Sequence, residues 1–458
     1  MKSISLYLGD EISGQMAGPG VRALEIGRLL SKTLNVSFIT PKGNFDLIDD
    51  TIINTSKSYN TLKEHKNNNI TIQMIQSIGI NHLKLPVDFG PRPVVIVDLY
   101  CPSWLENGVA AIARSDATQF QHRRDITILR DQLRHGDYFL CASMRQRDLL
   151  VGMLSVVGRV TSAQIKDDPS LSRLIGIVPF GMSSNDFVQV GPTVNSLLPS
   201  LTSKDRVVVW GGGIHDWLDV ETPIHAMALL RDRAPHIKLL FATSVSHPDH
   251  EVRPNAAKAQ LLAINSGLLQ KSVFFLEGWT PYDERDRYLR GATIGLVCHQ
   301  DHVETRFAFR TRVLDYLWAG LPIVTSDGDE FADLIRKFDL GIVVPPGDPQ
   351  ALADAFVTLV ERIDAGEPFN DRIASIRPLY HWDEVVKPLL EFCANPRKTA
   401  QLGDPVLMAG LPDVMTPRRE VSRLLYRTMT VLRNEGPKTV VRKVARKMLT
   451  LLRRARSG

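Results

Sequence analysis

The chain has 458 residues, of which 44% are hydrophobic and 23% are charged. This length exceeds what one ordinary hydrophobic core organises, so two domains are expected. The sequence contains no low-complexity tract and no uninterrupted run of about 18 apolar residues, which argues against a disordered chain and against a membrane-spanning helix. The four cysteines show no CxxC spacing, so a reducing compartment is favoured over a zinc site.

The net charge of +5 is unevenly distributed along the chain. Residues 416–458 contain 13 Lys/Arg and 2 Asp/Glu, whereas the preceding residues contain 42 Lys/Arg and 48 Asp/Glu. The body of the protein is therefore mildly acidic, and the basic character belongs to a C-terminal tail.

The first half alternates short apolar runs with helical patterns, beginning with a strand in ISLYLGD and a helix in VRALEIGRLLSKT. Further predicted strands are VSFIT, ITIQMIQ, VVIVDLY, YFLCAS and LIGIVPFG. The second half repeats the alternation with strands in DRVVVWGGG, IKLLFATS, VFFLEG, ATIGLVC and PIVTSDG and with helices near 221–234, 255–269 and 310–319.

Strands that alternate with helices predict parallel sheets covered by helices on both faces. We therefore expect an α/β protein with two doubly wound, Rossmann-like domains and ligands at the carboxyl ends of the strands. The expected boundaries are 1–185 for the first domain, 186–204 for a linker, 205–375 for the second domain, 376–394 for a terminal helix that returns to the first domain, 395–415 for an irregular connection and 416–458 for the basic tail.

One glycine-rich loop follows the first strand of each half. Gly18 and Gly20 precede the first helix, where glycine lets a phosphate approach the free N–H groups of the helix start. A tight turn that requires glycine explains this loop equally well. Gly211, Gly212 and Gly213 follow the predicted buried strand in the run DRVVVWGGG, and three consecutive glycines favour close approach of a ligand or of the other domain over a plain turn.

The stretch CHQDHVETRFAFRTR follows a predicted buried strand and contains His299, Asp301, His302 and Glu304. Loops after strands often carry function. A metal site is disfavoured because side chains so close in sequence cannot easily converge on one ion. A solvated polar loop remains an alternative.

Arg310 and Arg312 lie at the start of the predicted helix 310–319, where their charge opposes the helix dipole at a cost of ~0.3–1 kcal/mol each. A phosphate group at this position would reverse the sign of that interaction. The alternative is that either arginine pairs with Glu304, Asp315 or another carboxylate.

These features together resemble the GT-B glycosyltransferases, specifically family 4, over roughly residues 3–392. The resemblance is carried by AGPGVRALEIGRLL, FFLEGWTPYDERDRYLRGATIGLV, RVLDYLWAGLPIVTSDGDEFADLI and GIVVPPGDPQALADAF. FLCASMRQRDLLVGML and YHWDEVVKPLLEF are also similar to segments of this family.

The resemblance implies that Asp315 binds the nucleotide ribose as the second acid of the E-x7-E motif of the family and that Trp279 lies beside the base. The sequence departs from the family at two points. At the first point, Phe307 stands where the first glutamate is expected, and Glu304 is the nearest acid. At the second, the stretch GGGIHDWLDVET, which begins at Gly211, contains no Arg or Lys to bind the diphosphate. Arg310 and Arg312 are the expected substitutes for the missing diphosphate-binding cations.

The expected function is transfer of a hexosyl-type sugar from a nucleotide-diphosphate donor to a hydroxyl acceptor. The resemblance implies retention at the anomeric carbon and an acceptor held by the first domain. The expected pathway is cell-surface polysaccharide or glycolipid assembly. No cofactor, obligatory metal or dedicated general base is expected. The expected catalytic residues are Arg310, Arg312 and Glu304, and the expected donor-binding residues are Asp315, Gly18, Gly20, Gly211, Gly212, Gly213, Trp279, His299, Asp301 and Thr311. A GT-B sugar-nucleotide epimerase and a non-catalytic nucleotide-binding scaffold at the membrane are the alternatives.

The tail contains two amphipathic helical patterns with aliphatic residues on one side and basic residues on the other. This pattern is typical of helices that lie on an anionic membrane surface. A docking helix for a partner protein is the alternative, and nucleic acid is disfavoured because aromatic residues are not interleaved with the basic ones. We expect a cytoplasmic protein, peripheral on the inner face of the cell membrane. The expected lipid-binding residues are Arg423, Arg427, Arg442, Lys443, Arg446 and Lys447.

Overall fold

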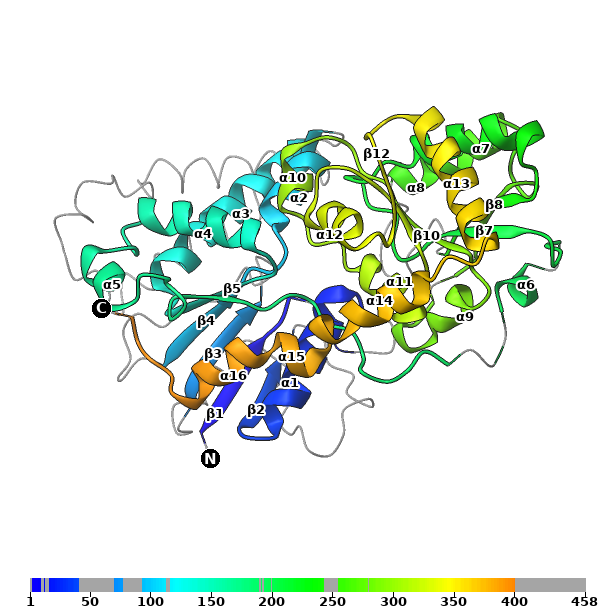
Figure 1. The fold of residues 1–458 in the computed structure, drawn as a ribbon. Helices are drawn as coiled ribbons and strands as arrows, with labels where there is room; N and C mark the ends of the chain where they lie inside the picture. Colours follow the sequence, from blue (N-terminus) through cyan, green and yellow to red (C-terminus); the bar gives the residue numbers. More distant parts are fainter. Residues whose placement is uncertain are drawn as a thin grey trace, which may run out of the picture. The chain divides into compact units, whose positions relative to one another are not determined.

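Figure 1 shows the fold of the chain in a computed structural model. The structure describes residues 2–9, 12, 16–40, 70–76, 93–112, 116–188, 191, 193–198, 200–242, 254–278 and 280–399. Trp279, most of the expected connection 395–415 and the whole basic tail, with its six expected lipid-binding residues, lie outside the described residues.

The first domain is built on a six-stranded parallel sheet with the order β2-β1-β3-β4-β5-β6. Its strands are β1 (Ser3–Tyr7), β2 (Asn35–Ile39), β3 (Ile70–Gln76), β4 (Val94–Asp98), β5 (Tyr138–Cys141) and β6 (Ile175–Ile177). The chain leaves β1 for the edge strand β2 and then returns to pair β3 with the other side of β1. The direction of winding therefore reverses between β1 and β3.

Helices cover both faces of this sheet because alternate strand residues point to opposite sides. One face packs against α2 (Ser103–Ile112), α3 (Asp116–His135) and α4 (Met144–Val156). The other face packs against α1 (Gly18–Ser31) and two helices from the end of the described chain. Gly27 of α1 permits this packing, since a Cβ there would lie 2.3 Å from the ring of Phe38. The short helix α5 (Ser162–Asp167) follows α4.

The second domain repeats the architecture with the sheet order β12-β11-β10-β7-β8-β9, all parallel. Its strands are β7 (Arg206–Trp210), β8 (Ile237–Phe241), β9 (Val273–Phe275), β10 (Ile294–Val297), β11 (Ile323–Ser326) and β12 (Gly341–Val344). Val207 and Val209 face one layer of helices, whereas Val208 and Trp210 face the other. β12 lies in the run GIVVPPGDPQALADAF, which carries part of the family resemblance and was not among the predicted strands.

Helices α7 (Glu221–Arg233), α8 (Pro254–Asn265) and α13 (Pro349–Asp364) cover one face of the second sheet. The other face packs against α9 (Asp286–Leu289), α11 (Arg312–Ala319), α12 (Glu330–Phe338) and α14 (Phe369–Ile376). A short helix, α10 (Val303–Phe307), lies between β10 and α11, and α6 (Val194–Leu197) lies in the segment between the two sheets.

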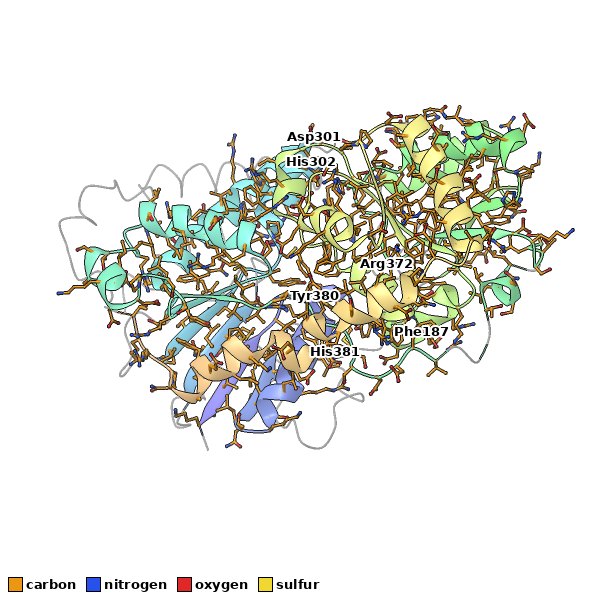
Figure 2. The ribbon with its side chains drawn as sticks, in the orientation of Figure 1. Phe187, Asp301, His302, Arg372, Tyr380 and His381 are labelled. Carbon is orange, nitrogen blue, oxygen red and sulfur yellow. The ribbon has the colours of Figure 1, made fainter. Side chains whose placement is uncertain are left out.

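The last described segment returns to the first domain through α15 (Trp382–Val385) and α16 (Lys387–Ala394), which lie beside α1 and the first sheet (Figure 1). The ring of Phe392 stacks on Tyr138 with the centroids 4.0 Å apart. His381, labelled in Figure 2, forms a parallel bridge with Met182 at the end of the first domain.

The expected α/β fold with two doubly wound parallel sheets is confirmed. The helix expected over 310–319 begins at Arg312, so the prediction that Arg310 belongs to its first turn was wrong. The polar stretch before it contains the helix α10, whose first turn is capped by His302. Within the described part of the chain, no helix is both long enough and apolar enough to span a membrane.

Candidate functional site

The candidate site lies where the winding of the second sheet reverses, between its neighbouring strands β7 and β10. Loops that leave the carboxyl ends of such strands in opposite directions open a crevice for ligands in doubly wound folds. Here these loops begin at Gly211 and Cys298, and α11 follows close by in the chain. The structure therefore groups the second glycine loop with the arginine-containing segment.

Tyr316 of α11 holds the glycine loop in place. Its hydroxyl accepts a hydrogen bond of 2.8 Å from the N–H of Gly211 and lies within 3.1 Å of the carbonyl oxygens of Val209 and Leu296. Gly212 has a φ of +72°, a left-handed conformation that favours glycine. The backbone conformation thus explains Gly212, whereas a Cβ on Gly211 would meet Tyr316 and Tyr288 only at ordinary contact distances of 3.4 Å or more.

Arg312, the first residue of α11, points its guanidinium at this loop. Nη2 donates a 2.9 Å hydrogen bond to the carbonyl oxygen of Gly213, and the guanidinium carbon lies 4.9 Å from the centre of the Trp210 ring. Nη1 is buried without a hydrogen-bond partner among the described residues. Burial and the charge of Arg310 lower the pKa of Arg312. The residue is therefore a constrained cation with an unused donor.

Asp315 lies one turn further along α11 and is partly exposed. Nε of Arg285 donates a 2.8 Å hydrogen bond to Oδ1 of Asp315, and the guanidinium also stacks on Tyr282 and Trp318. Burial raises the pKa of the Asp315 carboxyl, and Arg285 opposes that rise. Arg285 thus neutralises the carboxylate and fixes its orientation.

Arg310 makes a different contact from Arg312. Its Nη2 lies 2.7 Å from Oε2 of Glu304 in α10, and the two side chains are 6% and 0% exposed. The expectation that one of the arginines pairs with a carboxylate is thus met by Arg310. Of the arginines 285, 310 and 312, only Arg312 lacks a carboxylate partner in the described part of the chain.

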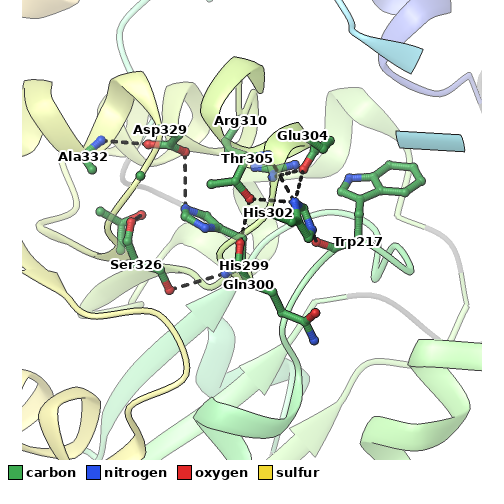
Figure 3. Close-up of polar contacts among 12 residues, drawn as sticks. Trp217, His299, Gln300, His302, Glu304, Thr305, Arg310, Ser326, Asp329 and Ala332 are labelled. Carbon is green, nitrogen blue, oxygen red and sulfur yellow. Dashed lines mark hydrogen bonds and ion pairs between the residues drawn. The ribbon is translucent and has the colours of Figure 1, made fainter. Parts of the chain in front are cut away.

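His302 connects α10 to the loop after β7 (Figure 3). Its Nδ1 accepts a hydrogen bond from the backbone N–H of Thr305, and its Nε2 lies 3.2 Å from the carbonyl oxygen of Trp217. These two contacts require the neutral tautomer with the proton on Nε2, because a carbonyl oxygen can only accept. His302 is therefore assigned to capping α10 and fastening it to the loop.

His299 and Asp329 lie buried behind this segment, with Nε2 of the histidine 3.6 Å from Oδ2 of the aspartate (Figure 3). Oδ1 of Asp329 accepts a 2.8 Å hydrogen bond from Ala332 and caps α12. Burial raises the pKa of Asp329 to about 6, and burial together with the Arg310 charge lowers the pKa of His299 to about 3. His299 is therefore neutral at physiological pH.

The first domain presents Gly18 and Gly20 at the start of α1. A Cβ on Gly18 would find only the Tyr100 hydroxyl, at 4.0 Å, so packing does not explain this glycine. Nearby, the buried Arg22 makes bonds of 2.8 and 2.9 Å to both oxygens of Asp98. Bidentate pairing fixes the start of α1 against the end of β4.

The structure brings together only part of the expected site. Arg312, Thr311, Asp315 and Gly211–Gly213 surround the start of α11, whereas Asp301 lies exposed at the turn before α10 (Figure 2). His299 is wholly buried.

Arg285 was missed because nothing in the run PYDERDRYLRG distinguishes it from the two arginines that follow. The described residues contain no group of three or more His, Cys, Asp or Glu side chains placed to hold a metal ion.

Comparisons with known proteins agree with this geometry. Residues 205–362 match the family model described as Glycosyl transferases group 1. An 83-residue stretch is 32% identical to phosphatidyl-myo-inositol mannosyltransferase of Mycobacterium leprae, over 18% of this chain and 22% of that protein. The chain thus matches about a fifth of the length of this curated relative.

Solved structures extend the similarity to the fold of both domains. Anabaena Alr3699/HepE in complex with UDP and glucose has a TM-score of 0.63 at 12% identity, over 86% of this chain and 100% of that one. Sucrose-phosphate synthase from Thermosynechococcus elongatus has a TM-score of 0.61 at 14% identity, over 86% and 98%. The described chain therefore has the GT-B fold, and its residues 205–362 are similar to the group 1 glycosyl transferases.

Proposed function

We propose that this protein is a family 4-like glycosyltransferase that moves a hexosyl group from a nucleotide-diphosphate donor to a hydroxyl acceptor. The observation that carries the proposal is the position of Arg312, a constrained cation without a carboxylate partner in the described chain. It stands at the first turn of α11 beside Gly211–Gly213, in the segment that matches the family model. Anions are favoured at such a helix start.

The donor nucleotide is assigned to the second domain. Arg312 and the glycine-loop amides would bind the diphosphate, and Asp315 would accept hydrogen bonds from the ribose hydroxyls through the oxygen that Arg285 leaves free. The structure of Alr3699/HepE with UDP and glucose is that of a protein with the same fold, which supports a nucleotide sugar as the donor class.

The proposed reaction breaks the bond between the anomeric carbon and the diphosphate oxygen and forms a bond from the acceptor oxygen on the same face of the sugar. Arg312 and the start of α11 would stabilise the negative charge that develops on the leaving diphosphate. A phosphate oxygen of the leaving group would take the acceptor proton, so no separate base is needed. The fixed cation Arg312 would supply the charge stabilisation for which other enzymes use a metal ion.

The test is a binding and turnover panel on the full chain. Uridine, guanosine, adenosine and thymidine diphosphates are titrated by calorimetry and thermal shift, followed by their hexose derivatives and glycan or lipid acceptors. At least one diphosphate should raise the unfolding temperature, since a ligand that binds only the native state stabilises it. Binding without release of nucleoside diphosphate across all donors would favour the non-catalytic scaffold, and release without an acceptor product would favour an epimerase. Absence of binding across the panel would contradict the proposal.

The acceptor is proposed to be lipid-linked or assembled at the membrane. The name of the mycobacterial relative specifies a mannosyltransferase acting on phosphatidyl-myo-inositol, which is a lipid. The basic sequence of residues 416–458 adds an electrostatic reason, because each Lys or Arg near an anionic surface contributes about 1 kcal/mol. We accordingly propose peripheral attachment to the inner face of the cell membrane.

Flotation with liposomes tests the attachment. Replacing the six basic residues of the tail named above by glutamine in the full chain should abolish co-flotation with anionic vesicles while leaving nucleotide binding intact. Equal recovery of both proteins with the vesicles would refute membrane binding by this segment and leave a partner protein as the explanation for its charge.

A further inference from the structure

Gln146 lies in the first turn of α4, and its buried side-chain amide joins the two domains. Nε2 donates to the carbonyl oxygen of Tyr100 at 3.0 Å and to the carbonyl oxygen of Phe307 at 2.8 Å. Oε1 accepts a 2.7 Å hydrogen bond from the N–H of Ala142. The amide therefore uses both of its hydrogens and its oxygen, and the side chain is only 3% exposed.

The two carbonyl groups belong to the two halves of the proposed reaction. Tyr100 lies just beyond the carboxyl end of β4 in the first domain, where its ring packs 4.4 Å below the guanidinium of Arg22 at the start of α1. Phe307 ends α10 in the second domain and stands five residues before Arg312. It also occupies the position at which the resemblance places the first glutamate. A single amide thus connects the acceptor side to the donor side.

The neighbouring residue of α4, Arg145, contacts the second domain at another loop. Nη1 of Arg145 donates a 2.6 Å hydrogen bond to the carbonyl oxygen of Gly328, and Nη2 forms an ion pair with Asp333 of α12. Gly328 precedes Asp329, which caps α12 and faces His299. The start of α4 therefore contacts the segments that follow β10 and β11. These segments contain the buried residues His299 and Asp329.

We propose that Gln146 is a positioning residue, which fixes the segment 303–312 from the first domain and so sets the distance between the acceptor side and Arg312. Only a carboxamide fits this position. A carboxylate offers no hydrogen to the two carbonyl oxygens, and an apolar side chain leaves both oxygens and the Ala142 N–H buried without partners, a loss of several hydrogen bonds at once. The expected effect on turnover rests on the proposed function, whereas the effect on the segment does not.

The test compares Gln146→Glu and Gln146→Met with a matched control, Gln73→Met. Gln73 is also buried and bonds Tyr7 at 3.3 Å, but it lies within the first sheet, away from the contact between the domains. Hydrogen exchange of the free protein should show faster exchange of the amides in 303–312 for both Gln146 variants. The control should leave that segment unchanged.

The catalytic readout separates positioning from folding. Both Gln146 variants should lower kcat by about tenfold or more, as expected when reacting groups lose their alignment, with the Kd for nucleoside diphosphate within twofold of wild type. The inference is overturned if exchange in 303–312 is unchanged, or if the control produces the same change there. It is also overturned if kcat stays within twofold while that exchange accelerates. A wild-type protein that binds no nucleoside diphosphate would refute the proposed function, and the exchange experiment would still decide whether Gln146 holds the segment.

Discussion

Arg310 and Arg312 are separated by one residue in the chain and lie in different chemical environments. Arg310 is buried against the carboxylate of Glu304, so its charge is neutralised inside the protein. Arg312 donates to a backbone carbonyl oxygen and packs over an aromatic ring, without a carboxylate partner in the described part of the chain. Each guanidinium has one buried donor without a partner among the described residues, so the carboxylate is what distinguishes the two arginines. A buried charge needs a partner to offset its desolvation, whereas a cation that binds an anionic ligand must not be neutralised by a carboxylate already. The contacts of Arg310 are those of a structural residue, whereas those of Arg312 are compatible with the ligand-binding role proposed for it.

The same contrast extends to the surrounding residues. Near Arg310, the polar side chains of His302 and Asp329 accept hydrogen bonds from backbone N–H groups and cap α10 and α12. Asp315 is partly exposed on the same helix as Arg312, with one oxygen engaged by Arg285. Residue type alone does not separate the two groups, because both contain arginines and carboxylates.

Breaking the buried pair should produce the largest effect. Arg310→Met leaves the Glu304 carboxylate buried without its counter-charge and should lower the free energy of unfolding by about 3–5 kcal/mol. Adding Glu304→Gln should recover much of that loss. Urea unfolding measures both, with Arg233→Met as the control, because its exposed pair with Asp354 should contribute less than about 1 kcal/mol. A loss below 1 kcal/mol for Arg310→Met would contradict the structural assignment.

Removing the second arginine should affect binding and catalysis rather than folding. Arg312→Ala should reduce kcat/KM by about 100-fold or more, the size seen when one donor to developing charge is removed, and should weaken nucleoside diphosphate binding. Arg287→Ala is the control, since its exposed guanidinium pairs with Glu284. Calorimetric affinity for the diphosphate within twofold of wild type would show that Arg312 does not contact it.

The stability of the folded protein should depend on the ionisation of the buried Asp329 carboxyl. The pKa of Asp329 is about 6 in the folded protein, above the ordinary value of 3.8, so the folded state binds this proton more tightly than the unfolded state. Its contribution to stability is complete below pH 3.8 and is lost as the pH rises through 6. The Asp329→Asn side chain does not ionise, so this variant does not lose stability in this way, and it keeps an oxygen to cap α12.

The asparagine variant should therefore gain stability relative to wild type between pH 4 and pH 7, on the order of 2 kcal/mol. Unfolding curves of both proteins across this range measure the difference. His299, whose pKa of about 3 makes folding less favourable as the pH falls below 6.5, lies 3.6 Å from Asp329 and is present in both proteins. A stability difference that does not change with pH would contradict the raised pKa.

The smallest expected effect concerns the ribose contact. Asp315→Asn keeps the shape of the side chain but replaces an acceptor oxygen by a donor, so nucleoside diphosphate affinity should fall by about tenfold, the equivalent of one or two hydrogen bonds. Comparison with the 2′-deoxynucleoside diphosphate sharpens the assignment, because the variant should discriminate less between the two sugars. Equal discrimination in both proteins would place the ribose elsewhere.

Much of the fold was predictable because its signals are local. Alternate residues of a strand face opposite layers, so runs such as VVVW identify a sheet buried on both sides, and the repeated order of strands and helices specifies two parallel sheets. The start of α11 was misplaced by two residues because Arg310 and Thr311 have no sequence signal that excludes them from a helix. The family resemblance singled out Asp315 as the expected ribose-binding acid. It also showed that Phe307 stands in the place of the first glutamate of the motif.

The two-domain architecture, the glycine loops at the strand ends and a short list of candidate polar residues follow from the sequence alone. The folded chain was needed to show that Glu304 neutralises Arg310, that Arg285 fixes Asp315 and that Gln146 bridges Tyr100 and Phe307. Hydrophobic periodicity is a property of residues close together in the chain, so it can be recognised from the sequence alone. The pairing of a buried charge or amide depends on which distant segments the topology brings within about 3 Å, a distance that no local pattern encodes.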